Sequence, residues 1–422
     1  MPGPRMTDEV LTRPSIDARR LMRRLDALAE VGDTGDGGVC RLALTDADRD
    51  GRDLVVSWMR ELSLRVEIDA IGNVVGTWPA DNHEPPVMTG SHIDTVRTGG
   101  RYDGNFGVLA GLEVIETVID AGISTDRPLA VAFFTDEEGA RFAPDMLGSL
   151  VYVGGLPLEV ALDIVAIDGA VLGDELERIG YRGPLPCPAR PPHAFVEAHV
   201  EQGRVLEAEG VTIGAVTGVQ GILWRELTIT GQSNHAGTTP MSMRHDAGYV
   251  AARLATEVRR IAEDIGGAQV GTVGRIDLQP NLVNVVAARA TLTVDLRNTD
   301  SSKLAEAERR LEDLIEELEH SEGVEIHSRE LARFAPVDFD PDIIGRIESA
   351  ARARSLSVER LPSGAGHDAQ MLARVCPAAM VFVPSVGGIS HNPIEHTDAS
   401  DLEAGANVLL DVMLDLATER PR

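Results

Sequence analysis

One continuous apolar run constrains the fold of this chain more than any other feature. The segment RPLAVAFFT, residues 127–135, has the length of a single strand and is apolar at nearly every position. Such a strand has to be covered on both faces, which is typical of parallel sheets packed between helices. Helix-like and strand-like patterns alternate around it, so the sequence predicts a largely parallel α/β sheet. The expected helices are 17–32, 46–62 and 106–122, and the other expected strands are 73–78, 85–90 and 194–200.

The middle of the chain follows a different order. Strand-like segments at 224–230, 268–276, 282–298 and 324–331 surround helical segments at 244–266 and 301–320. This order is β-α-β-β-α-β, the ferredoxin-like arrangement. The α/β pattern then resumes with a strand at 378–384 and a helix at 402–418. We therefore expect a discontinuous α/β domain, residues 1–213 and 332–422, interrupted by an inserted domain, residues 214–331. Residues 1–14 of the first segment are expected to form a loose tail.

Composition excludes several classes of protein. Hydrophobic residues make up 43% and charged residues 25% of the chain, as in an ordinary globular protein. A net charge of −28 disfavours nucleic acids and anionic membranes as partners. The three cysteines lie far apart, which argues against a disulfide framework and fits a reducing compartment. The first residues lack the apolar core of a secretory signal, and no apolar stretch approaches about 18 residues. We expect a cytoplasmic protein without a membrane span.

Histidines and carboxylates gather where four expected strands end, and ligands of open α/β sheets bind at that edge. Two or three histidines with two or three carboxylates suit two zinc or manganese ions that share a carboxylate bridge. The adjacent Glu137 and Glu138 cannot easily face one ion together, so one can bind metal while the other acts as a general base. The four clusters are His92, Asp94 and Asp103; Asp136, Glu137 and Glu138; Glu197, His199 and Glu201; and His391 and His396.

Six motifs together carry a family resemblance. They are GSHIDT, GGRYDGNFGVLAGLEV, TDEEGARF, EAHVEQG, GQSNHAGTTPM and SGAGHDA. From about residue 15 to 415 the chain resembles the M20-type metallo-amidohydrolases. The resemblance is to the branch of N-carbamoyl-L-amino acid hydrolases, β-ureidopropionases and allantoate amidohydrolases. It implies a mixed-sheet, metallopeptidase-like catalytic domain. It also implies that the inserted ferredoxin-like domain is a lid and a dimerisation domain, and that the chain forms a homodimer.

The resemblance also implies a role for each site residue. His92, Glu138, His199 and His391 would bind two metal ions, and Asp103 would bridge them. Glu137 would be the general base, and Asp94 would orient His92. Substrate contacts would come from His235 and Asn284 at the oxyanion, Arg297 at a substrate carboxylate, Gln202 at the ureido group and the backbone of Gly366. In related dimers some lid residues reach the neighbouring subunit's site. His367, Asp368, His396 and Gln220 lie near the same edge, without a direct role expected.

The expected reaction is hydrolysis of the carbamoyl C–N bond of N-carbamoyl-L-amino acids to an amino acid, ammonia and carbon dioxide. Peptidase relatives commonly have a carboxylate where this chain has His199, so EAHVEQG favours the amidohydrolase branch. Allantoate or ureidoglycolate hydrolysis, an aminoacylase or peptidase activity, and a binding protein with a decayed site are the alternatives. The sequence leaves open the accepted side chain, the enantiomer and the metal, since zinc, manganese, nickel and cobalt all suit these ligands.

Overall fold

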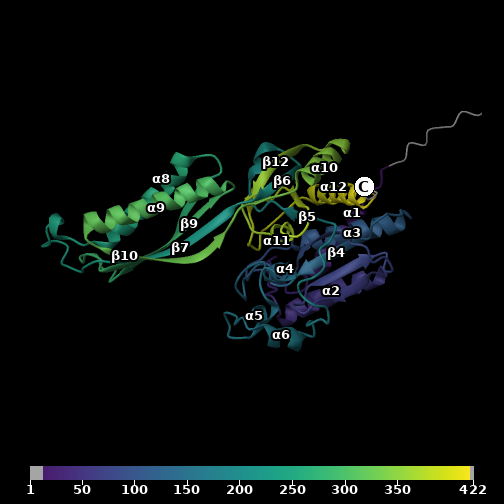
Figure 1. The fold of residues 1–422 in the computed structure, drawn as a ribbon, viewed down its shortest axis with the longest axis horizontal. Coiled ribbons are helices and arrows are strands. Elements are labelled where there is room, and N and C mark those ends of the chain that lie inside the picture. Colours follow the sequence, from purple (N-terminus) through teal and green to yellow (C-terminus); the bar gives the residue numbers. More distant parts are fainter. Residues whose placement is uncertain (1–12, 419–422) are drawn as a thin grey trace, which may run out of the picture. The chain divides into compact units, whose positions relative to one another are not determined.

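The chain divides into two compact units. The computed structural model describes residues 13–418. One unit comprises Met1–Thr217 and Phe339–Arg422, and the other comprises Gly218–Asp338 (Figure 1). The sequence-based insert, 214–331, has slightly different bounds because residues 213–219 form a strand of the first unit's sheet and the last strand of the insert runs to Phe334. The expected tail at 1–14 lies, except for Arg13 and Pro14, outside the described residues.

The first unit is built on a mixed sheet with the strand order β1-β2-β4-β3-β5-β13-β6-β11, in which β12 also pairs with β6. The four central strands, β4, β3, β5 and β13, run parallel, and the other pairs of this path are antiparallel. The parallel α/β pattern is therefore confined to the centre of the sheet. Its strands are β1 (Arg65–Ile68), β2 (Val74–Trp78), β3 (Val87–His92), β4 (Leu129–Phe134), β5 (Ala194–Val200), β6 (Ile213–Val219), β11 (Val337–Asp338), β12 (Val358–Ser363) and β13 (Ala378–Val383).

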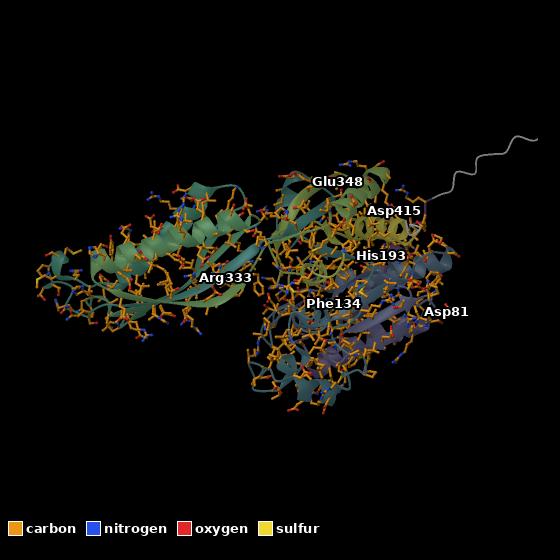
Figure 2. All side chains as sticks on the ribbon, in the orientation of Figure 1. Asp81, Phe134, His193, Arg333, Glu348 and Asp415 are labelled. Carbon is orange, nitrogen blue, oxygen red and sulfur yellow. The ribbon has the colours of Figure 1, made fainter. Side chains whose placement is uncertain are left out.

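Burial explains the apolar runs of the central strands. All residues of β3, β4, β5 and β13 are buried. Phe134, labelled in Figure 2, is fully buried at the carboxyl end of β4. The run at 127–135 is thus an inner strand, as predicted.

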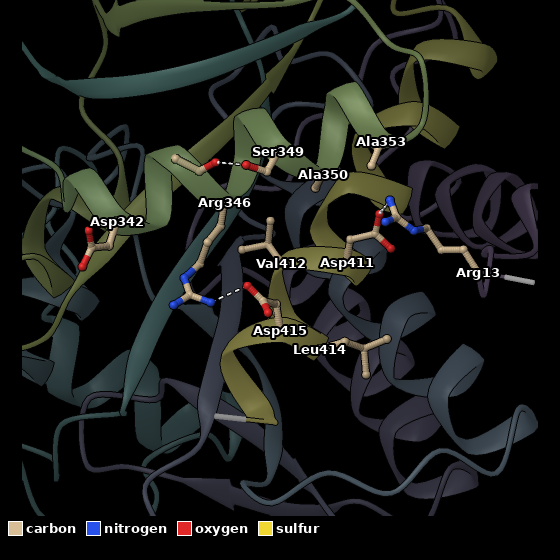
Figure 3. A pocket seen from close by; sticks show the side chains of 11 residues that line it. Arg13, Asp342, Arg346, Ser349, Ala350, Ala353, Asp411, Val412, Leu414 and Asp415 are labelled. Atoms are coloured by element: carbon tan, nitrogen blue, oxygen red, sulfur yellow. Dashed lines mark hydrogen bonds and ion pairs between the residues drawn. The ribbon is translucent and has the colours of Figure 1, made fainter. Parts of the chain in front are cut away.

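Helices pack against this sheet. Helix α3 packs on β3, β4, β5 and α12, and α10 packs on α12 and β13. Ion pairs of Arg346 with Asp415 and of Arg13 with Asp411 lie over α10 and α12 (Figure 3). The helices are α1 (Ala18–Ala29), α2 (Asp46–Glu61), α3 (Asn105–Asp120), α4 (Leu147–Tyr152), α5 (Leu158–Leu162), α6 (Leu172–Ile179), α7 (Val205–Glu209), α10 (Pro341–Ala353), α11 (Asp368–Leu372) and α12 (Ala399–Ala417).

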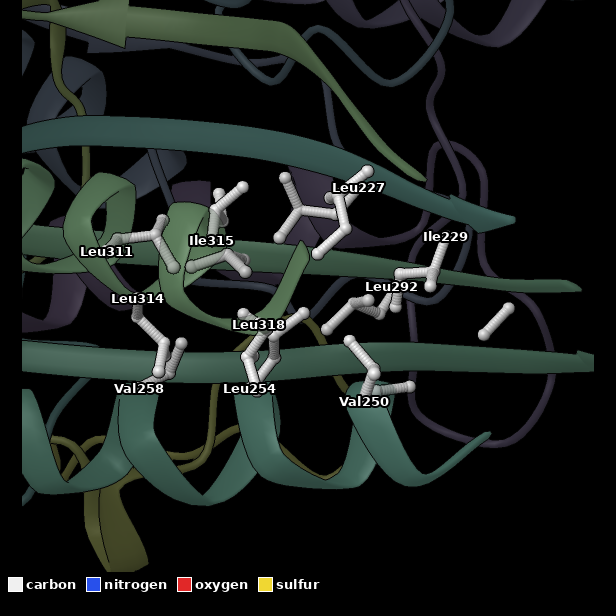
Figure 4. Packing of buried hydrophobic residues seen from close by; sticks show 14 of the residues in the cluster. Leu227, Ile229, Val250, Leu254, Val258, Leu292, Leu311, Leu314, Ile315 and Leu318 are labelled. Carbon is white, nitrogen blue, oxygen red and sulfur yellow. The ribbon is translucent and has the colours of Figure 1, made fainter. Parts of the chain in front are cut away.

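The second unit has the predicted β-α-β-β-α-β order. Its elements are β7 (Gly221–Thr230), α8 (Ala247–Ile265), β8 (Val270–Gln279), β9 (Arg289–Asn298), α9 (Ser301–Glu322) and β10 (Glu325–Phe334). The antiparallel sheet has the order β10-β7-β9-β8. Its core lies between one sheet face and the two helices, where Leu254, Leu292 and Leu311 meet (Figure 4).

One sequence-based expectation needs correction, and several elements were not predicted. The strand expected at 282–298 begins only at Arg289, because Pro280 and Asn281, which has a φ of 54°, turn the chain before a loop. Helices α4 to α7, α10 and α11 and strands β1, β6, β11 and β12 were not predicted. Most of them are too short for a periodic pattern to emerge. None of the helices within residues 13–418 combines the length and the apolar character that a membrane crossing requires.

Candidate metal centre

Parallel strands bring the polar clusters to one edge of the sheet. His92 is the last residue of β3, and His199 is the penultimate residue of β5. Their neighbours in register are Phe134, at the end of β4, and Phe382, near the end of β13. The loops that follow β4 and β13 carry Glu137, Glu138 and His391. Members of all four predicted clusters therefore meet in the first unit, whereas Glu201 accepts from the main chain of α7 and His396 pairs with Asp398.

Two groups of possible metal ligands share one carboxylate. His92, Asp103 and His199 form one group, and Asp103, Glu138 and His391 form the other. Asp103 Oδ1 lies 3.2 Å from His199 Nε2 and 3.7 Å from His92 Nε2. Asp103 Oδ2 lies 3.4 Å from His391 Nε2, which is 3.2 Å from Glu138 Oε2. Each oxygen of Asp103 thus faces a different group, as a bridging ligand requires.

The ring nitrogens of two histidines are oriented for metal binding. Nδ1 of His92 donates to the main-chain oxygen of Asp94 at 2.9 Å, and Nδ1 of His199 donates to that of Val200 at 2.8 Å. Each bond fixes the tautomer and leaves Nε2 with a lone pair on the side of Asp103. Burial lowers the pKa of His92, which favours its neutral ligand form. For His199 the effect of burial is outweighed by the carboxylates of Asp103 and Glu197, which raise its pKa to about 9. Imidazole nitrogens and carboxylate oxygens at such positions fit zinc, manganese, nickel or cobalt.

His391 differs from these buried histidines, since its side chain is about half exposed. Contacts with Asp103 and Glu138 raise its pKa to about 10, against the opposing effect of burial. The two carboxylates therefore favour a positive charge at this position.

Glu137 is close to the ligand groups but belongs to neither. Its Oε2 lies 3.4 Å from His92 Nε2. Burial, followed by the charges of Asp368 and Glu138, raises the pKa of Glu137 well above its ordinary value. A buried carboxylate with a raised pKa can accept and return a proton near neutral pH.

Asp94 contacts His92 through its main chain and both glutamates through its carboxylate. Its carboxylate lies 4.0 Å from His92 Nδ1, and the main-chain oxygen of Asp94 takes the imidazole proton instead. The two carboxylate oxygens accept the main-chain N–H groups of Glu137 and Glu138 at 3.3 and 3.4 Å. Asp94 thus connects the histidine to both glutamates.

Gln202 contacts the shared carboxylate. Its Nε2 donates to Asp103 Oδ2 at 2.9 Å, and its Oε1 is buried without a hydrogen-bond partner. The backbone of Gln202 has a φ of 57°, which is uncommon for a residue with a side chain. An unpaired buried acceptor beside the ligand groups is suited to an N–H donor of a substrate.

His367 is a neighbour of the centre for which sequence reasoning expected no direct role. Its ring centroid lies 4.6 Å from that of His199, and its Nε2 lies 2.9 Å from Ser363 Oγ. It forms a third possible ligand group with Glu197 and His199. The SGAGHDA motif, which contains His367, was the sequence signal that could have placed this residue at the centre. The flanking elements β12 and α11 are too short to be recognised from the sequence. Gly366, just before His367, approaches Met146 closely: a Cβ there would lie 2.8 Å from the Met146 Cε.

The other predicted substrate residues belong to the second unit. The main-chain N–H groups of Gly237 and Thr238 donate to His235 Nδ1 at 3.1 and 3.2 Å, which leaves the proton on Nε2. The Asn284 loop pairs with this segment, since Ala236 N donates to Asn284 O at 2.9 Å. Arg297 lies over the Trp224 ring, 5.7 Å from its centroid, and its Nη2 contacts Asp295 Oδ2 at 2.9 Å.

Comparison with known proteins identifies the family. The sequence profile of peptidase family M20/M25/M40 matches residues 88–415. The chain belongs to this family. The M20 chain is 42% identical over 403 residues to the N-carbamoyl-L-amino-acid amidohydrolase of Rhizobium meliloti, covering 95% of this chain and 97% of the relative. It is also 34% identical over 396 residues to the allantoate amidohydrolase of Bacillus subtilis, covering 93% and 96% of the two chains.

A solved structure of the same family is also similar to this chain. An amidase of the hydantoinase/carbamoylase family from Burkholderia multivorans matches with a TM-score of 0.93 and 46% identity, covering 96% of this chain and 99% of the other. The protein is therefore a metal-dependent amidohydrolase of the hydantoinase/carbamoylase branch of the M20 family.

Proposed function

We propose that this M20 enzyme hydrolyses N-carbamoyl-L-amino acids to an amino acid, ammonia and carbon dioxide. The observation that carries the proposal is Asp103, shared by two ligand groups with Glu137 beside them. His92, Asp103 and His199 would hold one divalent ion, and Asp103, Glu138 and His391 the other. When bound, such ions lower the pKa of a water molecule and polarise the carbonyl that is attacked.

Glu137 would transfer the proton in this reaction. Its buried carboxylate would take a proton from the attacking water and pass it to the leaving nitrogen. The raised pKa of Glu137 supports this role, because a stronger base accepts the proton more readily and the resulting acid is still able to release it.

The residues of the second unit would bind the substrate. The Nε2–H of His235 would donate to the oxygen that becomes negatively charged, with the help of Asn284. The guanidinium of Arg297 would bind the substrate carboxylate. The inserted domain would act as a lid and as the contact of a homodimer, and some of its residues would serve the neighbouring subunit's site.

The preference for a ureido group rests on Gln202. Its unpaired Oε1 would accept from the terminal NH₂ of a carbamoyl group, and the backbone near Gly366 would lie along the substrate. An N-acetyl group carries a methyl in place of this NH₂ and would leave the acceptor unsatisfied. A cytoplasmic location completes the proposal, and it is supported by the three cysteines, which are all free.

Allantoate hydrolysis is the second candidate, because the Bacillus subtilis relative acts on a substrate that also carries ureido groups and a carboxylate. The test is ammonia release by zinc- or manganese-loaded protein from N-carbamoyl-L-amino acids, their D forms, N-carbamoyl-β-alanine, allantoate and ureidoglycolate. Acetate release from N-acetyl amino acids is followed in parallel. Highest kcat/KM for an N-carbamoyl-L-amino acid is expected. Preference for allantoate would retain the residue roles but replace the substrate, and activity only on acetyl compounds would overturn the ureido assignment.

A further inference from the structure

We propose that Glu395 is a positioning residue that holds the shared ligand Asp103 and the loop of His391 in register with each other. The inference rests on the proposed function only in taking Asp103 and His391 as metal ligands. It concerns a carboxylate that belongs to neither of the two ligand groups that share Asp103.

Glu395 connects two distant loops. It follows β13 in sequence, and its side chain reaches a loop 293 residues earlier in the chain. There its Oε1 accepts the main-chain N–H groups of Tyr102 and Asp103, at 2.9 and 3.1 Å. Glu395 is 5% exposed, so water competes little for these bonds. The main chain of Asp103 is thereby fixed by a carboxylate from the loop that also carries His391.

A second connection runs through Ser390. The Ser390 hydroxyl donates to Asp103 Oδ2 at 3.0 Å and lies 3.5 Å from Glu395 Oε2. Thr98 adds a third connection, since its Oγ1 donates to the main-chain oxygen of His391 at 3.2 Å. His391 has a φ of 54°, a backbone conformation that its surroundings must maintain.

Gly100 provides the space for the carboxylate. A Cβ at this position would lie 2.3 Å from Glu395 Cδ and 2.4 Å from Glu395 Oε1. The φ of Gly100 is not in the left-handed region, so the requirement for glycine here is one of space alone. The carboxylate of Glu395 thus lies directly against the main chain of the Asp103 loop.

Asp103 needs this support because no regular element contains it. It precedes α3 in a glycine-containing turn, and both of its oxygens must face different partners at once. A displacement of its carboxylate toward one ligand group would weaken its contact with the other. Removing partners that orient metal ligands typically weakens metal binding 10–100-fold.

The test compares Glu395→Gln, Glu395→Ala and Gly100→Ala with Glu403→Gln, which removes the charge of an exposed glutamate on α12. The full-length protein is titrated with zinc against a chromophoric chelator, and the unfolding temperature of the metal-free protein is measured separately. We expect about 10–100-fold weaker binding of at least one ion in Glu395→Ala and Gly100→Ala. Glu395→Gln keeps the Oε1 acceptor and should recover most of the affinity. Glu403→Gln should bind like the wild type.

The outcomes separate this inference from the proposed function. Wild-type affinity for two ions in Glu395→Ala would overturn the positioning role alone. If Glu395→Ala does not fold, the same result in Gly100→Ala would overturn it. A lower unfolding temperature with unchanged zinc affinity would also overturn it, since that result describes a structural residue. Binding of fewer than two ions by the wild type would overturn the metal centre itself, and this inference with it.

Discussion

At the scale of single residues, close approach sets the geometry of the centre. Gly104 lies against the imidazole of His92, where a Cβ would come within 2.4 Å of the ring. Asp94 gives its main-chain oxygen to His92 and its carboxylate to the amides of both glutamates. These contacts orient the ligands, so changes of one methyl group or one charge should have measurable effects.

Gly104→Ala should abolish normal metal binding. The added methyl group would displace His92, and the φ of 65° adds a backbone penalty of about 1 kcal/mol. Gly122→Ala is the matched control, because Gly122 has a φ of 61° and open space around it. Metal content after dialysis measures the effect on metal binding. Unfolding in urea measures the backbone penalty. Equal metal content in the two variants would contradict the steric role of Gly104.

Glu137→Gln should reduce kcat by a factor of about 10²–10⁴, because the amide cannot accept a proton. The metal content should stay at the wild-type level, since Glu137 belongs to neither of the ligand groups that share Asp103. Steady-state kinetics and metal analysis on the same preparation test both statements. Near-normal turnover would disprove the general-base role.

Asp69 should make the stability of the protein depend on pH in a defined window. Burial raises its pKa from 3.8 to about 6, although the contacts with Asn73 oppose this. Between these pH values the folded chain binds the proton more strongly than the unfolded chain. The contribution of this proton to the free energy of unfolding is therefore complete below pH 4 and is lost as the pH rises through 6. The total loss is at most about 3 kcal/mol.

Asp69→Asn tests this dependence, because an amide does not titrate. The free energy of unfolding in urea, measured for both proteins from pH 4 to 7, gives a difference curve in which other groups cancel. The wild type should lose stability relative to the variant as the pH rises. A flat difference curve would contradict the raised pKa.

At the scale of elements, the predicted helices of the inserted unit pack as their periodicity indicates. Val250, Leu254 and Val258 of α8 are buried on one face, and they meet Leu311 and Leu318 of α9 against the sheet (Figure 4). Asp246 caps α8 by accepting from Gly248 N and Tyr249 N. The short helices of the first unit have no such signature, and packing decides their formation.

Leu254→Ala should lower the free energy of unfolding by about 2–5 kcal/mol, because Leu254 is fully buried and the change leaves a cavity. Leu282→Ala is the control: Leu282 is 59% exposed, so its loss should cost no more than about 0.5 kcal/mol. Chemical unfolding of both variants measures the difference. Equal costs would contradict the packing of α8 in this core.

At the scale of the whole molecule, the inserted unit has a sheet edge suited to pairing. Strand β8 lies at one end of the sheet order, with Val270 and Ile276 each 45% exposed. Both edge strands form side-chain ion pairs with Glu226 of β7, through Arg275 of β8 and Arg329 of β10. Strand β10, at the other end, exposes one large hydrophobic side chain, Leu331, where β8 exposes two. Exposed apolar edge strands favour pairing with a second chain. We therefore place the proposed dimer contact at β8.

Light scattering should give twice the chain mass of 45.2 kDa for the wild type. Ile276→Lys should shift the protein toward the monomer, because a charge would be buried in the contact. Leu331→Lys, on β10 with 43% exposure, should leave the mass unchanged. A monomeric wild type would overturn the dimer, and dissociation by Leu331→Lys alone would move the contact to the other edge.

Sequence by itself determined the types of the long elements, their order and the donors at the strand ends. Strands such as β4 and helices such as α8 and α9 have local periodicity, which encodes which face is buried. The residue types His, Asp and Glu at the ends of β3, β4 and β5 carry the metal chemistry, and the six motifs carry the family. None of this information depends on which segments meet in space.

Tertiary structure alone decided the contacts between distant loops. Asp103 faces two ligand groups, His367 lies beside His199, and Glu395 reaches Asp103 across 292 residues. All three contacts depend on strand register and loop conformation. The same holds for β6, which joins the main sheet by pairing with β13. Local patterns specify faces but not partners, because pairing is selected by the packing of the whole sheet.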